Sequence, residues 1–522
     1  MSSATSQLRH SRFLLAALAT AISLAACSSD KIVYRDRQPF NTPPVAAAGF
    51  VGYYDTTTKQ TTCGNCHADY QADWSTTKHA HAVATLTASA GKADACYSCH
   101  TVTGNGNAAK GSTAGHDAVK VAAYNDVQCE SCHGAGLQHV EGVGQGTLIR
   151  PLAAISMTGT GNCGDCHSGV HNPFAEEWKA SEHAVAPTGS HATSATCAGC
   201  HEGRAALAKW GVKANYKEKT LAADPGQALT CAVCHDPHGS ANPAQLRKSI
   251  SSADPEQNLC MQCHNRRNVP ETGASSPHAP QGAVLLGLAG YRPPGFAYDT
   301  ARIYGSHATN LNPRLCAGCH VTKFTVTDKL TGAFTFQATG HLMRPVPCLD
   351  ATGKPTADKT CAYTTTARSW QSCTASGCHA TAAVAANAFN TVRARMKFLA
   401  DQIWLNSNND GTLQGTPTDG GILATLKSTR PSEWSNSDNV ITPAEGAEFN
   451  ARLCGEYNQA NSDNSKGIHN PFLCEALLVS TINYLRSYYS LPAASISVQE
   501  QIDKPMTEQF KGSMHVSRSA PR

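Results

Sequence analysis

Long apolar runs, aromatic residues and charge are all scarce in this chain of 522 residues. Aromatic residues make up 7% of it and charged residues 15%, with a net charge of +4. A balance this close to neutral, without a basic patch, argues against a nucleic-acid partner. An apolar stretch from Phe13 to Ala26 has only 14 residues, too short to cross a bilayer as a stable helix. Few long periodic apolar runs precede residue 380, so side chains alone do not predict an ordinary core there.

Cysteine and histidine, by contrast, are abundant, with 23 of each. Eight times, two cysteines separated by two residues are followed directly by a histidine, where about 0.04 such patterns are expected by chance. The pairs are Cys63/Cys66, Cys96/Cys99, Cys129/Cys132, Cys163/Cys166, Cys197/Cys200, Cys231/Cys234, Cys260/Cys263 and Cys316/Cys319. The histidines that follow them are His67, His100, His133, His167, His201, His235, His264 and His320.

This spacing is typical of c-type haem attachment. Two thiols one short turn apart can each bond a porphyrin vinyl group, and the next residue then supplies an imidazole to the iron. Structural zinc sites instead combine two ligand pairs, and a redox-active pair is expected once, beside a βαβ pattern. Eight sites for haem c are therefore predicted.

A ninth site is predicted at Cys373, Cys378 and His379. Its cysteines are two residues further apart, but the terminal Cys-His is kept, and Gly377 can absorb the extra turn. The alternatives are a disulfide, or one free and one paired thiol.

Residues 1–26 have the pattern of an export signal, with Arg9 and Arg12 ahead of the apolar stretch. The stretch ends in Leu24-Ala25-Ala26-Cys27, which resembles the lipobox of bacterial lipoproteins. That resemblance implies acylation of Cys27 and a lipid anchor, with residues 27–60 as a tether. Ordinary cleavage beside a stray cysteine is the alternative. Export fits both haem c and disulfides.

The motifs also predict the architecture. Residues 63 to 379 provide about 35 residues per haem, too few for a separate protein core around each. We expect a mainly α fold with extensive loops and little β, in which a few short helices wrap around a chain of covalently bound haems. Residues 61–260 read as a duplicated three-haem repeat, because Cys63 to His67, Trp74 and His79 correspond to Cys163 to His167, Trp178 and His183. Residues 261–380 are assigned the three further motifs and residues 381–522 a helical C-terminal cap.

A second histidine per iron would complete bis-histidine ligation, and the chain has enough of them. The candidates lie in recurring settings, such as the His-Asn-Pro-Phe that begins at two of them, where Asn and Pro would cap and start a helix. They are His79, His139, His171, His183, His191, His238, His307, His341 and His469. Weaker candidates, each more typical of a solvent-facing residue, are His81, His116, His278 and His515.

The remaining cysteines predict two local disulfides, Cys348 with Cys361 and Cys454 with Cys474. Helices are expected over residues 384–405, after a capping box at Thr442 and Glu445, and from about Leu473 to Tyr489.

Taken together, these motifs resemble the outer-surface multihaem lipoprotein cytochromes of dissimilatory metal-reducing bacteria. The resemblance covers residues 24 to about 489. It implies an outer-membrane lipoprotein, at the cell surface, that receives electrons from other redox proteins or an outer-membrane conduit. The implied acceptors are extracellular ones such as metal oxides. The residues alone imply electron transfer, since bis-histidine iron has no open coordination position for a substrate.

Two alternatives stay open. The first is a multihaem oxidoreductase with one open haem acting on a nitrogen or sulfur oxyanion, although no motif here has the Lys that often marks the catalytic haem in such reductases. The second is a subunit that polymerises into a haem filament, which lipidation at Cys27 would disfavour.

Overall fold

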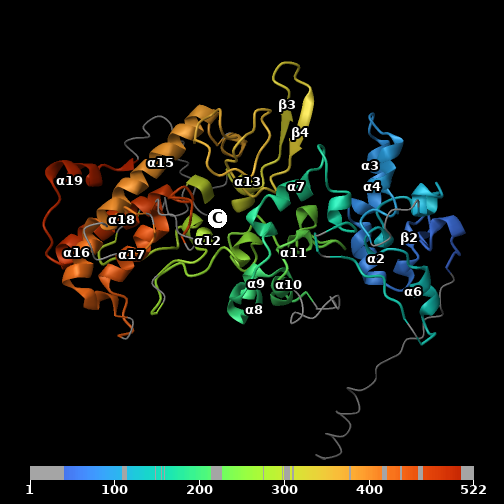
Figure 1. The fold of residues 1–522 in the computed structure, drawn as a ribbon, viewed down its shortest axis with the longest axis horizontal. Helices are drawn as coiled ribbons and strands as arrows, with labels where there is room; N and C mark the ends of the chain where they lie inside the picture. The colour runs from blue at the N-terminus through green and yellow to red at the C-terminus, as the bar shows by residue number, and fades with distance from the viewer. Residues whose placement is uncertain are drawn as a thin grey trace, which may run out of the picture. The chain divides into compact units, whose positions relative to one another are not determined.

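The computed structural model describes residues 40–506, except 108–113, 147, 155, 158, 213–225, 274–275, 297, 299–305, 309–310, 376–377, 409, 414–419, 436–437 and 456–461. The chain divides into two compact units, residues 1–42 and 43–522. The predicted signal at residues 1–26, Cys27 and most of the tether therefore lie outside the described residues. Everything below concerns the second unit (Figure 1).

The second unit begins with short elements joined by long loops. Strands β1 (Tyr53–Asp55) and β2 (Gln60–Thr61) form an antiparallel pair. The helices that follow are α2 (Ala68–Ser75), α3 (Ala82–Thr87), α4 (Tyr97–His100), α5 (Cys129–His133) and α6 (Leu137–Gly142). Short 3-10 helices lie between them: η1 (Val45–Ala47), η2 (Cys63–Asn65), η3 (His79–His81), η4 (Asp94–Cys96), η5 (Gly115–Asp117) and η6 (Ala122–Tyr124).

The middle of the chain also consists of short helices joined by long loops. Its α-helices are α7 (Phe174–Lys179), α8 (Ser190–Thr193), α9 (Ala195–His201), α10 (Gly203–Lys209), α11 (Cys231–Cys234), α12 (Gln281–Leu285), α13 (Cys316–His320) and α14 (Gln371–Thr374). The 3-10 helices are η7 (Cys163–Asp165), η8 (Glu182–Ala184), η9 (Pro243–Gln245), η10 (Cys260–Gln262) and η12 (Ser306–Ala308). A second antiparallel pair, β3 (Phe324–Thr327) and β4 (Phe334–Ala338), forms a hairpin. The expected mainly α fold with extensive loops and little β is confirmed.

The first two repeats make the same contacts around a buried tryptophan. The indole of Trp74 donates to the Val127 carbonyl at 2.9 Å, and that of Trp178 donates to the Leu229 carbonyl at 2.9 Å. Each acceptor lies two residues before a motif cysteine, Cys129 or Cys231. The sequence correspondence thus extends to tertiary hydrogen bonds.

The longest described helices follow the ninth motif and are α15 (Ala382–Ile403), α16 (Gly421–Thr429), α17 (Pro443–Cys454) and α18 (Pro471–Tyr488). Helix α19 (Ile496–Asp503) is as long as α2, and the 3-10 helix η14 (Pro431–Trp434) lies between α16 and α17. The predicted capping box is present, because Thr442 accepts from the Glu445 amide and Glu445 accepts from the Thr442 amide. At α18 the side chain of Asn470 accepts from the Leu473 amide, and Pro471 begins the helix. These three predicted helices are confirmed.

The other His-Asn-Pro-Phe, at residues 171–174, behaves differently. Helix α7 begins at Phe174 with Pro173 at the N-cap, and no side chain caps it. The expectation that Asn172 caps this helix is wrong, because the chain turns one residue later and leaves Asn172 in the preceding loop, exposed.

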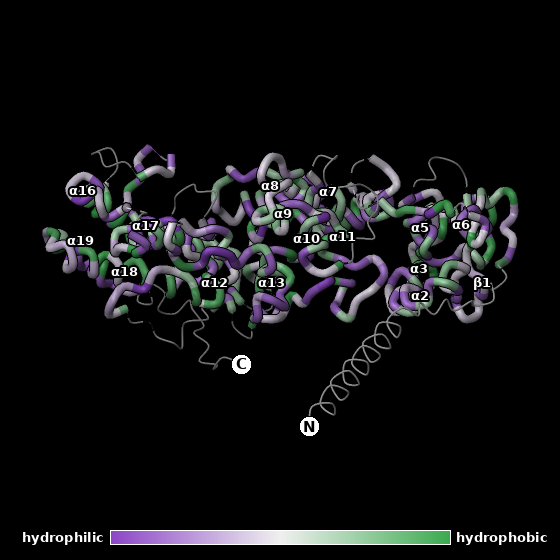
Figure 2. Tube along the Cα trace, turned by 90° about the horizontal axis from the view of Figure 1, so that it is seen from below, coloured by the Kyte–Doolittle hydropathy of each residue, from purple (hydrophilic) through white to green (hydrophobic). Residues whose placement is uncertain are grey.

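The main apolar core lies in this C-terminal helical region. Its fully buried members include Met396 and Leu399 of α15, Leu423 of α16, Phe449 of α17 and Leu477 of α18. Between residues 47 and 389, Ala283, Val284 and Ala289 join this core, and the other buried apolar clusters are small and separate. Figure 2 shows hydrophobic and hydrophilic residues alternating over short distances there. The protein therefore provides little of its own core where the motifs lie.

Both predicted disulfides are present. Cys348 is bonded to Cys361, and Cys454 at the end of α17 is bonded to Cys474 in the first turn of α18. The eighteen motif cysteines take part in neither of these bonds. Pairing at Cys373 and Cys378, the alternative to a ninth haem, is therefore absent from the described disulfides.

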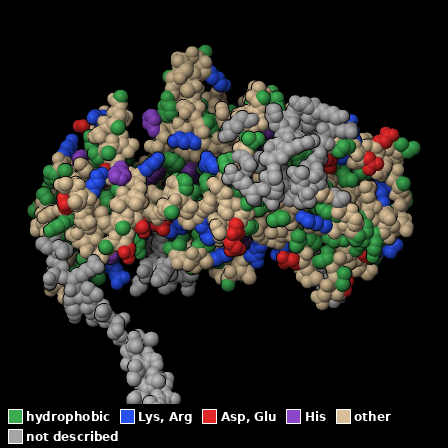
Figure 3. All heavy atoms as spheres, turned by 180° about the vertical axis from the view of Figure 1, so that it is seen from behind, with side chains coloured by type: hydrophobic (Ala, Val, Ile, Leu, Met, Phe, Trp, Pro, Cys, Tyr) green, Lys and Arg blue, Asp and Glu red, His purple; other side chains and the backbone are tan. Residues whose placement is uncertain are grey.

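The space-filling view shows one face of the molecule (Figure 3). Histidine side chains reach the surface there, and Lys or Arg side chains are interspersed with Asp and Glu instead of gathering into one area of either sign. Within the part of the chain described above, no helix is both long and apolar enough to span a bilayer.

Candidate haem sites

We number the motifs as sites 1 to 9 by their first cysteines, Cys63, Cys96, Cys129, Cys163, Cys197, Cys231, Cys260, Cys316 and Cys373. The local backbone brings the parts of each motif together. At sites 1, 4 and 7 the motif begins in a 3-10 helix, whereas at sites 3, 5, 6 and 8 it lies on an α-helix. Sites 1, 4 and 7 are the first motifs of successive sets of three.

The ninth motif closes in the same way as the shorter ones. At sites 1, 4, 6 and 7 the amide of the motif histidine donates to the carbonyl of the first cysteine at 2.9 to 3.0 Å. At site 9 the His379 amide donates to the Cys373 carbonyl at 3.0 Å, despite the two additional residues. His379 thus occupies the position relative to Cys373 that the other motif histidines occupy relative to theirs.

Seven motif histidines face a second imidazole at a nearly constant spacing. Ring centroids are 6.3 Å apart for His67 and His139, 6.1 Å for His79 and His167, 6.3 Å for His133 and His238, 6.2 Å for His183 and His264, 6.3 Å for His201 and His278, 6.3 Å for His235 and His341, and 6.1 Å for His320 and His469.

This spacing has a simple origin. A metal–imidazole nitrogen bond is about 2.0 Å long. The centre of the ring lies about 1.1 Å beyond that nitrogen, given ring bonds of about 1.33 Å. Two imidazoles on opposite sides of one iron therefore have centroids about 6.2 Å apart. The residues present fit a six-coordinate haem at seven sites.

The geometry separates the candidate distal histidines into groups. His79, His139, His183, His238, His341 and His469 are paired at this spacing. His191 lies 4.7 Å from His201, too close for the opposite side of an iron, and His171 stacks on Phe334 at 4.7 Å. His278, a weaker candidate by sequence, is paired with His201 instead. No recurring motif surrounds His278, so only the tertiary structure singles it out.

Sites 2 and 9 are arranged differently. His307 lies near His379, which lowers the pKa of His307 after the larger effect of burial. Among the described histidines none is paired with His100 at the spacing above. His116, another weaker candidate, is buried and stacks at 5.4 Å on Tyr97 of the site 2 motif.

Hydrogen bonds to Nδ1 orient many of these rings. Backbone carbonyls lie 2.7 to 3.0 Å from Nδ1 of His100, His133, His139, His235, His307 and His320. With Nδ1 engaged, Nε2 is left for a metal. Burial lowers the pKa of His79, His264, His307, His320 and His341 to about 4, so these rings are neutral at pH 7 and keep the lone pair that ligation requires.

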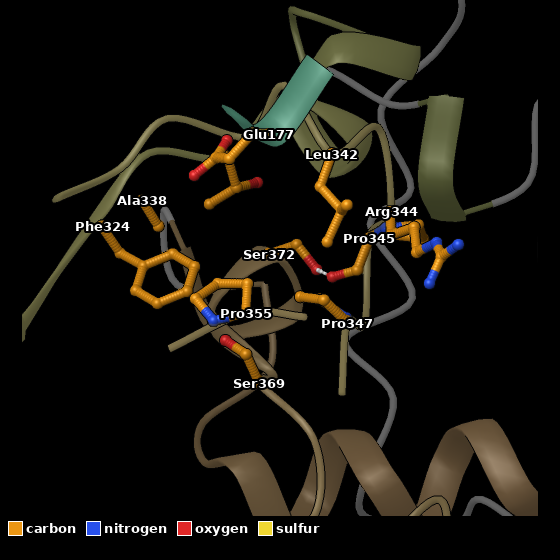
Figure 4. Close-up of a pocket in the computed structure, with 12 residues that line it drawn as sticks. Glu177, Phe324, Ala338, Leu342, Arg344, Pro345, Pro347, Pro355, Ser369 and Ser372 are labelled. Carbon is orange, nitrogen blue, oxygen red and sulfur yellow. Dashed lines mark hydrogen bonds between the residues drawn. The ribbon is translucent and has the colours of Figure 1, made fainter. Parts of the chain in front are cut away.

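His341 is additionally held from another repeat. Glu177 of α7 is buried, and its carboxylate accepts from the Thr339 amide at 2.8 Å, the Thr339 hydroxyl at 2.6 Å and the His341 amide at 2.7 Å. Figure 4 shows Glu177 pointing into the small pocket that Leu342 and Phe324 also line. No sequence pattern distinguishes this glutamate.

Motif cysteines of different sites are neighbours. Mutual effects on the thiol pKa place Cys63 beside Cys129, Cys99 beside Cys166, Cys163 beside Cys231, Cys200 beside Cys263 and Cys260 beside Cys316. Longer-range electrostatic effects on pKa connect Cys132 with Cys163, Cys260 with Cys234, and Cys319 with Cys373.

These contacts define an order in space. Sites 1, 3, 4, 6, 7, 8 and 9 follow one another, while site 2 branches from site 4 and site 5 from site 7. The two branches are equivalent, because the Cys99 thiol lies 4.0 Å from the Asp165 carbonyl and the Cys200 thiol lies 3.9 Å from the Gln262 carbonyl.

Cys66, the second predicted attachment residue of site 1, and Cys163 are the two motif cysteines that are exposed, and the other sixteen are partly buried. Haem attachment at Cys66, as at the other motif cysteines, stays a prediction from the motif.

A mainly α chain with repeated Cys-x-x-Cys-His motifs and paired imidazoles defines the class of multihaem c-type cytochromes with covalently bound haem c. Two family models match parts of it, "Cytochrome c554 and c-prime" over residues 62–134 and "Doubled CXXCH motif" over residues 224–268. No solved structure matches the chain.

Particular relatives come from Geobacter sulfurreducens. The C-type polyheme cytochrome OmcC of strain ATCC 51573 / DSM 12127 / PCA is 31% identical over 172 residues, which are 26% of this chain and 22% of that protein. The C-type polyheme cytochrome OmcB of strain DL-1 / KN400 is 28% identical over 192 residues, 31% of this chain and 24% of that protein. The match thus spans about a quarter or less of the relatives' own length.

Proposed function

We propose that this protein transfers electrons along nine haem c sites, most of them with bis-histidine ligation. The observation that carries this proposal is the unbroken series of neighbouring motif cysteines from Cys63 to Cys373. Haem bonded to these cysteines supplies a one-electron carrier at each site. Because the thioether positions of successive sites adjoin, the carriers come close enough for electrons to pass between them.

Paired histidines suit this role. An imidazole on each side leaves no position for a substrate, so oxidation and reduction require little rearrangement. Hydrogen bonds to Nδ1 hold the rings in place in both oxidation states. The proposed distal ligands are His139 for site 1, His238 for site 3, His79 for site 4, His278 for site 5, His341 for site 6, His183 for site 7, His469 for site 8 and His307 for site 9.

We further propose that the protein is exported, anchored through Cys27 in the outer membrane, and passes electrons from redox proteins or an outer-membrane conduit to extracellular acceptors such as metal oxides. The lipobox and the resemblance to outer-surface cytochromes support this location. Mass spectrometry of the native N-terminus would test the anchor, and an acylated Cys27 is expected. Mixing the reduced protein with a ferric oxide should oxidise every haem.

The central test is electron paramagnetic resonance of the oxidised full-length protein together with its haem content. Nine haem equivalents, of which at least the seven paired sites are low-spin, are expected. A high-spin signal from any of sites 1, 3, 4, 5, 6, 7 or 8 would contradict the proposed ligation.

A second candidate function is supported by site 2. No described histidine is paired with His100, so this site is where an open haem of an oxidoreductase would lie. A high-spin signal of one equivalent that is altered by nitrite or hydroxylamine, and lost when His100 is replaced by Met, would favour that function.

A further inference from the structure

The loop before α18 brings a buried carboxylate against a ligand histidine. Asp463 Oδ1 lies 2.6 Å from His469 Nδ1, and the Asp463 side chain is 0% exposed. The other Asp463 oxygen, Oδ2, accepts from the Ser465 hydroxyl. Three residues of this loop, Asn464, Lys466 and Gly467, have positive φ, so the chain reverses sharply between Asp463 and His469.

His469 faces His320 with its ring centroid 6.1 Å away. Its position is fixed by the start of α18, because Asn470 is the N-cap and Pro471 the first helical residue. The His469 amide also donates to Ser465 Oγ at 3.1 Å. The carboxylate thus meets a ring that cannot readily turn away from it.

This environment differs from those of the other ligand histidines. Six of them have Nδ1 against a neutral backbone carbonyl, and those of His264 and His341 meet the Gln281 amide oxygen at 3.3 Å and the Thr339 hydroxyl at 3.2 Å.

One other carboxylate faces a ligand histidine, and it provides a comparison. Asp236 Oδ1 lies 3.4 Å from His238 Nδ1, with the Asp236 side chain 28% exposed. Its Oδ2 is 2.6 Å from Arg247, whose positive charge offsets it. The Asp236–His238 contact is therefore longer than the Asp463–His469 contact, and the Asp236 carboxylate is partly solvated and paired with an arginine. The Asp463 carboxylate is buried, and the interactions given above pair it with no cationic Lys or Arg side chain.

We propose that Asp463 is a positioning residue that lowers the reduction potential of the haem held at site 8. This inference rests on the proposed ligation of that haem by His320 and His469. A carboxylate that accepts the Nδ1 proton makes the imidazole a stronger donor and favours the ferric state. Burial removes solvent screening, so the negative charge also acts on the iron across the ring.

The place of site 8 gives this effect a role. Cys316 adjoins Cys260 of site 7, and Cys319 adjoins Cys373 of site 9. Electrons that travel along the series must therefore cross site 8 to reach site 9. If site 8 has the lower reduction potential, electron transfer from site 7 to site 8 is unfavourable. Site 8 then separates sites 1 to 7 from site 9.

The test is a spectropotentiometric titration of the full-length holoprotein and its Asp463→Asn variant, with haem content and low-spin signals recorded for both. Asparagine keeps the size and an acceptor oxygen but removes the charge. We expect one haem equivalent to move to a more positive midpoint potential, with nine haems retained. No shift would overturn the inference.

Two further variants separate the causes. Asp236→Asn is the matched control, and a shift as large as that of Asp463→Asn would overturn the special role of Asp463. His469→Met tests the premise, because it should change one low-spin signal. If it changes none, the ligation itself fails; if it changes one while Asp463→Asn shifts nothing, the ligation stands and the inference about Asp463 fails.

Discussion

His79 faces His167 with ring centroids 6.1 Å apart, although the two residues belong to different repeats. His183 stands in the same relationship to His264 of the next set of motifs, at 6.2 Å. Each histidine follows its repeat's buried tryptophan, Trp74 or Trp178, and is hydrogen-bonded through its carbonyl to the acceptor segment ahead of Cys129 or Cys231. A recurring local arrangement thus supplies a ligand candidate to the first site of the following set.

Site 5 offers a direct choice between two distal ligands. Replacing His278 by Met should raise the midpoint potential of one haem equivalent, because methionine ligation stabilises ferrous iron. The matched variant His191→Met should leave all potentials unchanged, since His191 is 4.7 Å from His201 and cannot lie across an iron from it. Potentiometric titration of both proteins measures the effect. The opposite result would transfer the ligand role to His191.

The ninth site can be tested by mass. The full-length protein should carry nine haems, and the Cys373→Ala/Cys378→Ala double variant should carry eight, because it lacks both thiols of site 9. Intact-protein mass spectrometry counts the attached groups. A double variant with the mass loss of the two sulfur atoms alone would show that site 9 never held haem.

The disulfide between Cys454 and Cys474 should stabilise the C-terminal helices. It closes a loop with a sequence separation of 20, and such a cross-link contributes about 3 kcal/mol to the free energy of unfolding. The Cys454→Ala/Cys474→Ala variant should lose about this amount in denaturant titrations followed by far-ultraviolet circular dichroism. Haem content should stay the same, because neither cysteine lies in a motif. An unchanged unfolding midpoint would contradict the prediction.

Glu130 predicts a pH dependence of stability. Its side chain is 2% exposed and accepts from the amides of Val51, Gly52 and Gly136. Burial outweighs these hydrogen bonds and raises the pKa of Glu130 from 4.5 to about 7. The folded state holds the Glu130 proton more tightly than the unfolded state does. The contribution of Glu130 to the free energy of unfolding therefore falls as pH rises from 4.5 to about 7.

The size of that fall is up to about 3 kcal/mol. Denaturant titrations at pH 4 and pH 8 on the normal protein and on Glu130→Gln isolate it, because glutamine does not titrate. The normal protein should lose more of its free energy of unfolding between pH 4 and pH 8 than Glu130→Gln does. If the free energy of unfolding depends on pH equally in both proteins, Glu130 is not the cause of the pH dependence.

Sequence and structure agree best where the chemistry is local. The motif spacing, the capping box at Thr442 and Glu445, and the disulfides each depend on residues close in the chain, and these predictions required no tertiary information. Distal ligands depend on contacts between repeats. His171 and His191 have recurring sequence settings but lie away from the required spacing, whereas His278 has none and lies at it.

Glu177 and Asp463 illustrate a second limit. Each is an ordinary acidic residue in the sequence, and its importance comes from the histidine loop packed against it. A carboxylate becomes informative only when its burial and its hydrogen-bond partners are known. The shortage of periodic apolar runs predicts that only small apolar clusters form between residues 47 and 389. It does not predict which residues make up each cluster.

The pairing of histidines across repeats also sets an order in time. If the chain is exported from its N-terminus, Cys129 and His133 emerge long before His238, and Cys231 and His235 long before His341. The proposed distal ligands of these two sites would therefore arrive only with a later part of the chain. Site 4 is the reverse case, because His79 is already present when Cys163 appears. Maturation of this protein would therefore complete some sites at once and leave others open until a later repeat has emerged.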